Sequence, residues 1–217
     1  MIFINNPIFA QNKFEAGFDF KPQLTSLSGK DNFINSHTNS RKEKTIISFG
    51  LSLGYNMKDK IIVSTGVNYN PQGIAKEKVT INNIGESYFK TDMDYLRIPI
   101  KFSFSLFQIN DFRFKISTGL GVNYLLKVED NLINVLDFVN SIIKEPDERY
   151  NKFVFDVLTS FGFDCKISDK LYLETNLEGL YGINKFHKKY YLGSNGNIEI
   201  DSKNCSLGLI IGLRYKL

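Results

Sequence analysis

Histidine and acidic side chains are the residues of this chain that could support hydrolytic chemistry. The two histidines, His37 and His187, lie far apart in the sequence, so they do not suggest a shared metal site. An Asp–His pair could act as a general base, and the acids that could join His187 are Asp92, Asp94, Asp130, Asp147 and Glu148. Solvated side chains are the simpler interpretation, and we expect no catalytic residue, no metal site and no cofactor.

A second group of charged residues occupies alternate positions of otherwise apolar segments. Glu174 or Glu178 could pair with Arg97 or Arg214. Such a pair resembles a catalytic dyad, but buried charges must also pair wherever they fill a protein interior. We favour this structural interpretation. No glycine-rich phosphate loop with a lysine is present. The glycines of Gly119-Leu120-Gly121 lie in the middle of an alternating segment, which indicates packing within a strand.

The elements that must position these residues are strands. From Cys205 to Leu217 the odd positions are almost all apolar and the even ones mostly small or charged. Successive side chains of a strand point to opposite faces, so the segment has one apolar and one polar wall. The same pattern predicts eight strands, near 13–23, 45–57, 60–72, 92–107, 111–127, 151–167, 170–184 and 204–217.

The connections between these strands alternate between short and long. The short ones are polar turns near 57–60, 108–111 and 168–170. The long ones are 24–44, 73–91, 128–150 and 185–203, and helical spacing over 132–143 suggests a short helix in the third. Barrels of the outer membrane show this polarity, with short turns at one end and long loops at the other.

The two walls indicate which side faces the membrane. The polar walls combine Gly and Ser with charges, which suits the narrow interior of an eight-stranded barrel. The apolar walls carry large side chains that would overfill that interior. We therefore predict an all-β, eight-stranded, antiparallel up-and-down transmembrane barrel over 12–217. Its predicted interior charge network is Glu15, Asp19, Arg97, Lys101, Asp156, Asp164, Glu174, Glu178 and Arg214.

Composition agrees with a barrel and excludes other classes. Aromatic residues make up 14% of the 217 residues, with 19 Phe, 11 Tyr and no Trp. No apolar run approaches the roughly 18 residues of a transmembrane helix. The net charge of +4 comes from charges spread along the chain, so nucleic acid is not an expected partner. A soluble sandwich or a lipocalin-like binding barrel is the alternative fold.

Several segments resemble the PorT-like family of outer-membrane β-barrels. The most specific runs from Tyr95 to Phe102, Tyr-Leu-Arg-Ile-Pro-Ile-Lys-Phe, and is similar to the family's Tyr-Leu-x-Ile-Pro-Leu segment. The stretches 66–73, 118–126, 161–164 and 207–217 match more loosely. Arg97 stands where the family commonly has an acidic residue. The resemblance implies an outer-membrane barrel and, for some members, a role linked to protein secretion.

Three local features carry further predictions. Residues 1–11 resemble the end of a secretory signal peptide, although a basic segment is missing and Asn5, Asn6 and Pro7 interrupt the apolar stretch. Cys165 and Cys205 should lie at opposite ends of the barrel, so we expect two free thiols. Pro99 has no backbone N–H to donate to a neighbouring strand, so we predict a bulge there, with the proline ring turned inward. The alternative is that a strand starts just after Pro99.

The function expected from the sequence is that of a non-catalytic outer-membrane barrel. Its partners would be outer-membrane lipid and proteins that contact the long loops 24–44, 73–91, 128–150 and 185–203, and we expect a monomer. A structural role and a role in secretion or surface interaction both stay open. The alternatives are a barrel enzyme with its active site at the external rim and the soluble binding barrel.

Overall fold

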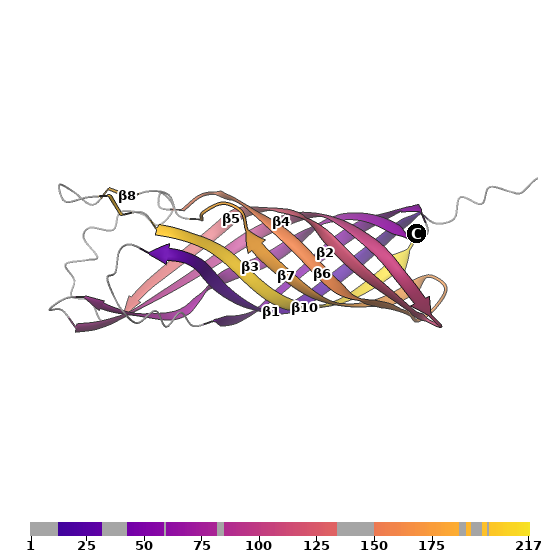
Figure 1. Cartoon of the computed structure of the whole chain (residues 1–217), viewed down its shortest axis with the longest axis horizontal. Helices are drawn as coiled ribbons and strands as arrows, with labels where there is room; N and C mark the ends of the chain where they lie inside the picture. The colour runs from indigo at the N-terminus through magenta and orange to yellow at the C-terminus, as the bar shows by residue number, and fades with distance from the viewer. Residues whose placement is uncertain are drawn as a thin grey trace, which may run out of the picture.

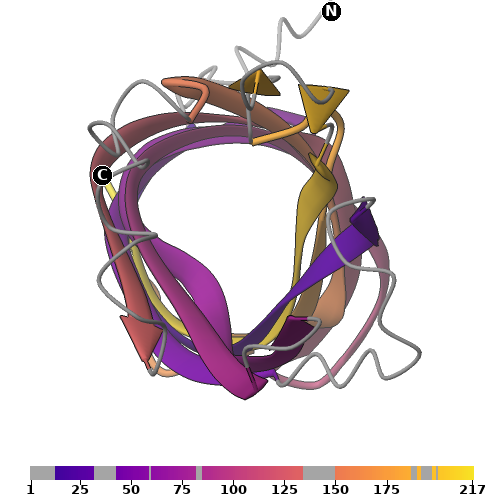
Figure 2. The same ribbon diagram turned by 90° about the vertical axis from the view of Figure 1, so that its left-hand side faces the viewer.

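Eight long strands close into an antiparallel barrel in this computed structural model (Figures 1 and 2). The structure describes residues 13–31, 43–58, 60–81, 85–133, 150–186, 190–191, 197–198 and 200–217. The long strands are β1 (Phe14–Asp31), β2 (Lys44–Lys58), β3 (Ile61–Ile81), β4 (Gly85–Ile109), β5 (Phe112–Ile133), β6 (Phe153–Lys166), β7 (Leu171–Gly182) and β10 (Ile200–Lys216). In addition, β8 (Tyr190–Tyr191) pairs with β9 (Asn197–Ile198). No helix among these residues is long and apolar enough to cross a membrane.

Each long strand pairs with the next long strand of the chain, so that β7 pairs with β10, and β1 pairs with β10 to close the ring. The pairing is staggered, so a row of partners that leaves β1 at Ala16 returns to β1 at Ser26. The row passes through Leu53, Thr65, Ile100, Leu120, Val157, Tyr181 and Cys205. Closure of a sheet into a barrel requires such a stagger, which tilts the strands, as their diagonal course in Figure 1 shows. The predicted fold class is confirmed.

Strands at the loop end are longer than the sequence pattern predicted. β1 continues to Asp31 in pairing with β10, and β3 and β4 stay paired up to Ile81 and Gly85. The predicted loops 24–44 and 73–91 are therefore wrong over much of their length. Alternation disappears there because neither face of a strand beyond the membrane needs an apolar wall, while backbone pairing continues.

Parts of the other predictions fall on residues that the structure does not describe. Leu132 and Ile133, the start of the predicted helix, belong to β5, and 134–143 lie outside the described residues. The signal-like segment 1–11, His37, His187, Asp147 and Glu148 also lie outside the described residues.

The turns at the other end are short, as predicted. Asn110 has a φ of 50° in the β4–β5 turn, a left-handed conformation that asparagine tolerates well. In the β6–β7 turn Lys166 Nζ lies 2.7 Å from Asp169 Oδ1. Their hydrogen bond lowers the pKa of the exposed Asp169 carboxyl.

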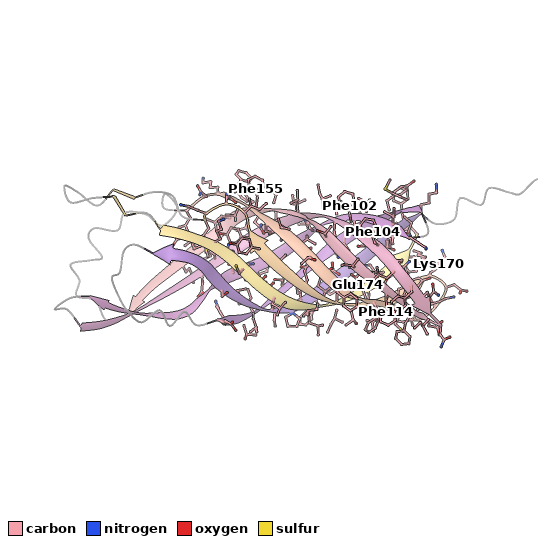
Figure 3. All side chains as sticks on the ribbon, in the orientation of Figure 1. Phe102, Phe104, Phe114, Phe155, Lys170 and Glu174 are labelled. Carbon is pink, nitrogen blue, oxygen red and sulfur yellow. The ribbon has the colours of Figure 1, made fainter. Side chains whose placement is uncertain are left out.

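The apolar walls face outward and the polar walls face inward. Leu51 is 66% exposed, whereas Glu174 is 1% exposed. Figure 3 shows Phe102 and Phe155 projecting away from the barrel wall, while Lys170 lies at the turn end. This is the arrangement that a lipid exterior requires.

Pro99 does not form the predicted bulge. The register between β3 and β4 is the same on both sides of Pro99, and Gly66 and Val67 opposite it have no β4 partner in the ladder. The ladder skips these positions because proline has no N–H to donate. Pro99 borders an internal cavity, as expected for an inward position. The register shifts of β4 against β5 lie instead at Asp94/Tyr95 and Ser105/Phe107.

A second proline ends the pairing of β3 with β2. Their ladder stops at Tyr69, and Pro71 follows. The Pro71 carbonyl accepts a hydrogen bond from Gln23 Nε2 at 3.3 Å, and the Gly73 carbonyl accepts one from Thr25 Oγ1 at 3.1 Å. Side chains of β1 therefore satisfy backbone groups that a neighbouring strand would otherwise pair.

Candidate functional site: the filled lumen

The predicted interior residues all lie on the inner wall of the barrel. Seven are buried: Glu15, Arg97, Asp156, Asp164, Glu174, Glu178 and Arg214. Asp19 and Lys101 are slightly more accessible, with 13% of each side chain exposed. They come from five strands, so the closed ring brings together residues that are distant in sequence.

The turn half of the lumen is organised around two carboxylates. Glu174 lies 2.5 Å from Arg214, 3.0 Å from Lys115 and 3.7 Å from Lys101. Asp164 lies 2.6 Å from both Arg113 and Lys115. Lys115 therefore bridges the two carboxylates and joins the pairs into one network.

A second layer of charges crosses the middle of the lumen. Arg97 donates two hydrogen bonds to Asp156, at 3.0 and 2.7 Å, and Asn123 donates another at 2.6 Å. Glu178 lies 3.1 Å from Lys21 and 3.8 Å from Arg97. These bonds provide the compensation that desolvated charges need.

Three bases of this network were not among the predicted residues. Lys21, Arg113 and Lys115 lie on the same inner wall and form ion pairs. Together with the nine predicted residues they make a set of six acids and six bases. Their positions in the alternation were the signal that could have identified them. Among the described residues, Glu15 is the acid of this set for which no ion pair is found.

An apolar cluster closes the loop end of the lumen. We call this cluster the outer plug, and it consists of Met93, Tyr95, Leu125, Val128, Tyr150, Val154 and Phe186. Tyr150 and Phe186 stack with ring centroids 6.2 Å apart, and Asn151 N donates to the Phe186 carbonyl at 2.7 Å. The alternation of the sequence does not predict the plug, because Tyr150 and Phe186 lie outside the long strands and Met93 and Tyr95 interrupt a polar wall.

Little free space remains within the described lumen. One cavity of about 30 Å³ is bordered by Lys101, Asn68 and Pro99, and another of about 10 Å³ lies near Asn204 and Ser206. A single internal water needs about 10–15 Å³. The described residues therefore enclose room for a few waters but no open channel.

Of the acids considered for catalysis, Asp92, Asp94 and Asp130 lie in the described part of the chain, on the paired strands β4 and β5. Asp92 pairs with Lys44, Asp94 lies in β4 and Asp130 in β5. No cluster of three or more His, Cys, Asp or Glu side chains suited to a metal occurs there. Neither Cys165 nor Cys205 is in a disulfide, as predicted, and β7 separates their strands.

Comparison with protein families agrees with this geometry. Residues 9–188 match the model of the family described as outer membrane protein beta-barrel domain. This chain belongs to that family. The protein is accordingly located in the outer membrane, which excludes the soluble binding barrel. No curated protein matches the chain significantly in sequence.

Solved structures of outer-membrane barrels share the fold. Neisserial surface protein A has 13% identity and a TM-score of 0.50, covering 94% of this chain and 97% of its own. OprG from Pseudomonas aeruginosa has 12% identity and a TM-score of 0.53, with coverage of 95% and 97%. AlkL, solved in DMPC lipid bilayers, has 14% identity and a TM-score of 0.50, with coverage of 95% and 92%. At these identities the likeness concerns the fold alone.

Proposed function

We propose that this protein is a non-catalytic, closed barrel that presents its loop-end segments to protein partners at the cell surface. The observation that carries the proposal is the filled lumen. The charge layers and the outer plug leave cavities of about 30 and 10 Å³, too small for passage of a solute larger than water. The parts available for recognition are then the strand extensions and loops at the loop end.

The β3–β4 hairpin is the largest described element of this surface. Its backbone pairs continue from Glu77–Phe89 to Ile81–Gly85, beyond the last β2–β3 pair at Phe49–Tyr69. A paired hairpin loses less conformational entropy on binding than a free loop of the same length. It therefore offers a partly preorganised surface to a partner.

The resemblance to PorT-like barrels makes a contribution to protein secretion the more specific form of this proposal. Two residues of the segment that resembles this family, Tyr95 and Pro99, have structural roles inside the barrel and give no separate support for secretion. Tyr95 belongs to the outer plug, and Pro99 borders the larger cavity. The secretion role therefore depends on the resemblance, and the surface role depends on the structure.

The test replaces residues 77–89 by a two-residue Asn-Gly turn in the source bacterium. We expect the shortened protein to reach the outer membrane, with the heat-modifiable gel mobility of a folded barrel, while secreted or surface-bound proteins decrease. The control variant is Leu51→Ile, a conservative substitution on the lipid-facing wall that leaves the hairpin intact. Two results together would contradict the proposal and indicate a transport function. They are normal levels of secreted and surface proteins in the shortened strain, and solute uptake by liposomes that contain the wild-type protein.

A rim enzyme is tested separately with purified protein in lipid vesicles. The changes are His187→Ala and Asp147→Ala, and the measurements are lipid and peptide hydrolysis. We expect no hydrolysis by wild type or variants. Hydrolysis by the wild type that disappears in either variant would establish the enzyme.

A further inference from the structure

The smaller cavity lies between the middle charge layer and the outer plug. It has a volume of about 10 Å³. Val154 of the plug and Asp156 of the charge layer both border it, so it touches both parts of the lumen. The polar residues around it are Gln72, Asn123, Asp156, Asn204 and Ser206, each at most 9% exposed.

Two atoms at this cavity have no hydrogen-bond partner among the described residues. They are Asn204 Oδ1 and Ser206 Oγ, and both are buried. A buried polar atom without a partner costs about 1–3 kcal/mol. Two such atoms at one small cavity are therefore best explained by a ligand that bonds to both.

We propose that this cavity binds one internal water molecule. The water donates one hydrogen bond to Asn204 Oδ1 and accepts one from the Ser206 hydroxyl. Its second hydrogen is directed to Asp156 Oδ1, which accepts one protein hydrogen bond, from Arg97 Nη2 at 2.7 Å. Three partners are the usual number for a buried water, and the cavity has about the volume of one.

The charges around the cavity favour water over a metal cation. Oxygen atoms surround it, which a sodium ion could use, but Arg97 already neutralises Asp156 through two hydrogen bonds. An additional positive charge beside this pair would be buried without a counter-charge. Water satisfies the same oxygen atoms without that cost.

The test uses NMR of deuterated protein in detergent micelles. Cross-peaks between water and the amides of Asn204 and Ser206 should show the sign of a long-lived bound water. Ser206→Val fills the cavity and should reduce these cross-peaks to the noise level. Ser117→Val is the matched control, because Ser117 is buried but bonds to Ser103 at 2.8 Å and does not border the cavity.

Three results would overturn the proposal. The first is absence of the cross-peaks in the wild type, and the second is their persistence in Ser206→Val. The third is a shift of the Asn204 amide signal when sodium replaces N-methylglucamine in the buffer, which would indicate a bound cation. Should Ser206→Val not fold, Ser206→Thr serves instead. It keeps the hydroxyl and adds one methyl group to the cavity, and it should also remove the cross-peaks.

Discussion

At the scale of single residues, the lumen distinguishes two carboxylates that look equivalent in the sequence. Glu174 contacts Lys101, Lys115 and Arg214, whereas Glu15 is buried without an ion pair among the described residues. Alternation places both on the inner wall. Only the three-dimensional arrangement assigns partners to one of them.

Glu174→Gln should therefore destabilise the barrel much more than Glu15→Gln. Loss of the Glu174 charge removes an acid that three bases share, although Lys115 keeps Asp164 and Arg214 keeps Asp19. Breaking a buried pair by removing one partner costs about 3–5 kcal/mol. The free energy of unfolding, from urea titration in lipid vesicles, measures both variants. Equal losses for the two would contradict the network described here.

Glycine positions on the two walls should also differ. A Cβ at Gly121 would lie 2.5 Å from Asp156 Oδ1 and 2.7 Å from Arg97 Nε, whereas one at Gly179 would meet nothing within 4 Å. We expect Gly121→Ala to cost about 1–3 kcal/mol through overpacking and Gly179→Ala to change stability by less than about 0.5 kcal/mol. The same urea titration tests this, and a tolerated Gly121→Ala would show that the Arg97–Asp156 pair can move.

At the scale of elements, the segments before β6 and after β7 are fastened to the barrel through the outer plug. Tyr150 and Phe186 stack on each other, and Asn151 donates to the carbonyls of Phe186 and Lys185, at 2.7 and 2.8 Å. The plug thus fixes where two loops leave the barrel.

Phe186→Ala should cost about 3–5 kcal/mol, because it opens a cavity among fully buried side chains. Phe155→Ala is the matched control, since Phe155 is 45% exposed on the outer wall and should lose less than half as much. Unfolding in vesicles measures stability, and limited proteolysis should show faster cleavage near the plug in Phe186→Ala alone. Similar losses for the two variants would remove the distinction between plug and wall.

At the scale of the whole molecule, the outer wall should respond to charge as a lipid-facing surface does. Leu120 is 58% exposed in β5, and Met57 is 57% exposed near the turn end of β2. Arginine costs about 2–4 kcal/mol at the bilayer midplane and about 0–1 kcal/mol near an interface. We expect these costs for Leu120→Arg and Met57→Arg, respectively, by unfolding from vesicles. Equal small costs would mean that Leu120 does not face the lipid interior.

The sequence alone determined the strands of the membrane-spanning part and the direction of their walls. This was possible because the period of two is local, and because Gly, Ser and charges gather on one side, as at Ser48, Gly50 and Ser52 of β2. It did not determine where strands such as β3 end, since pairing beyond the membrane needs no alternation.

The tertiary structure decided which residues meet. Closure and stagger bring Asp19 of β1 to Arg214 of β10, with 2.5 Å between their charged atoms, and they join Lys115 to Glu174 across the lumen. They also bring Tyr150 and Phe186 together in the outer plug. The physical reason is that a side chain's face follows from its own strand, whereas its partners follow from the register of all eight strands around the closed ring.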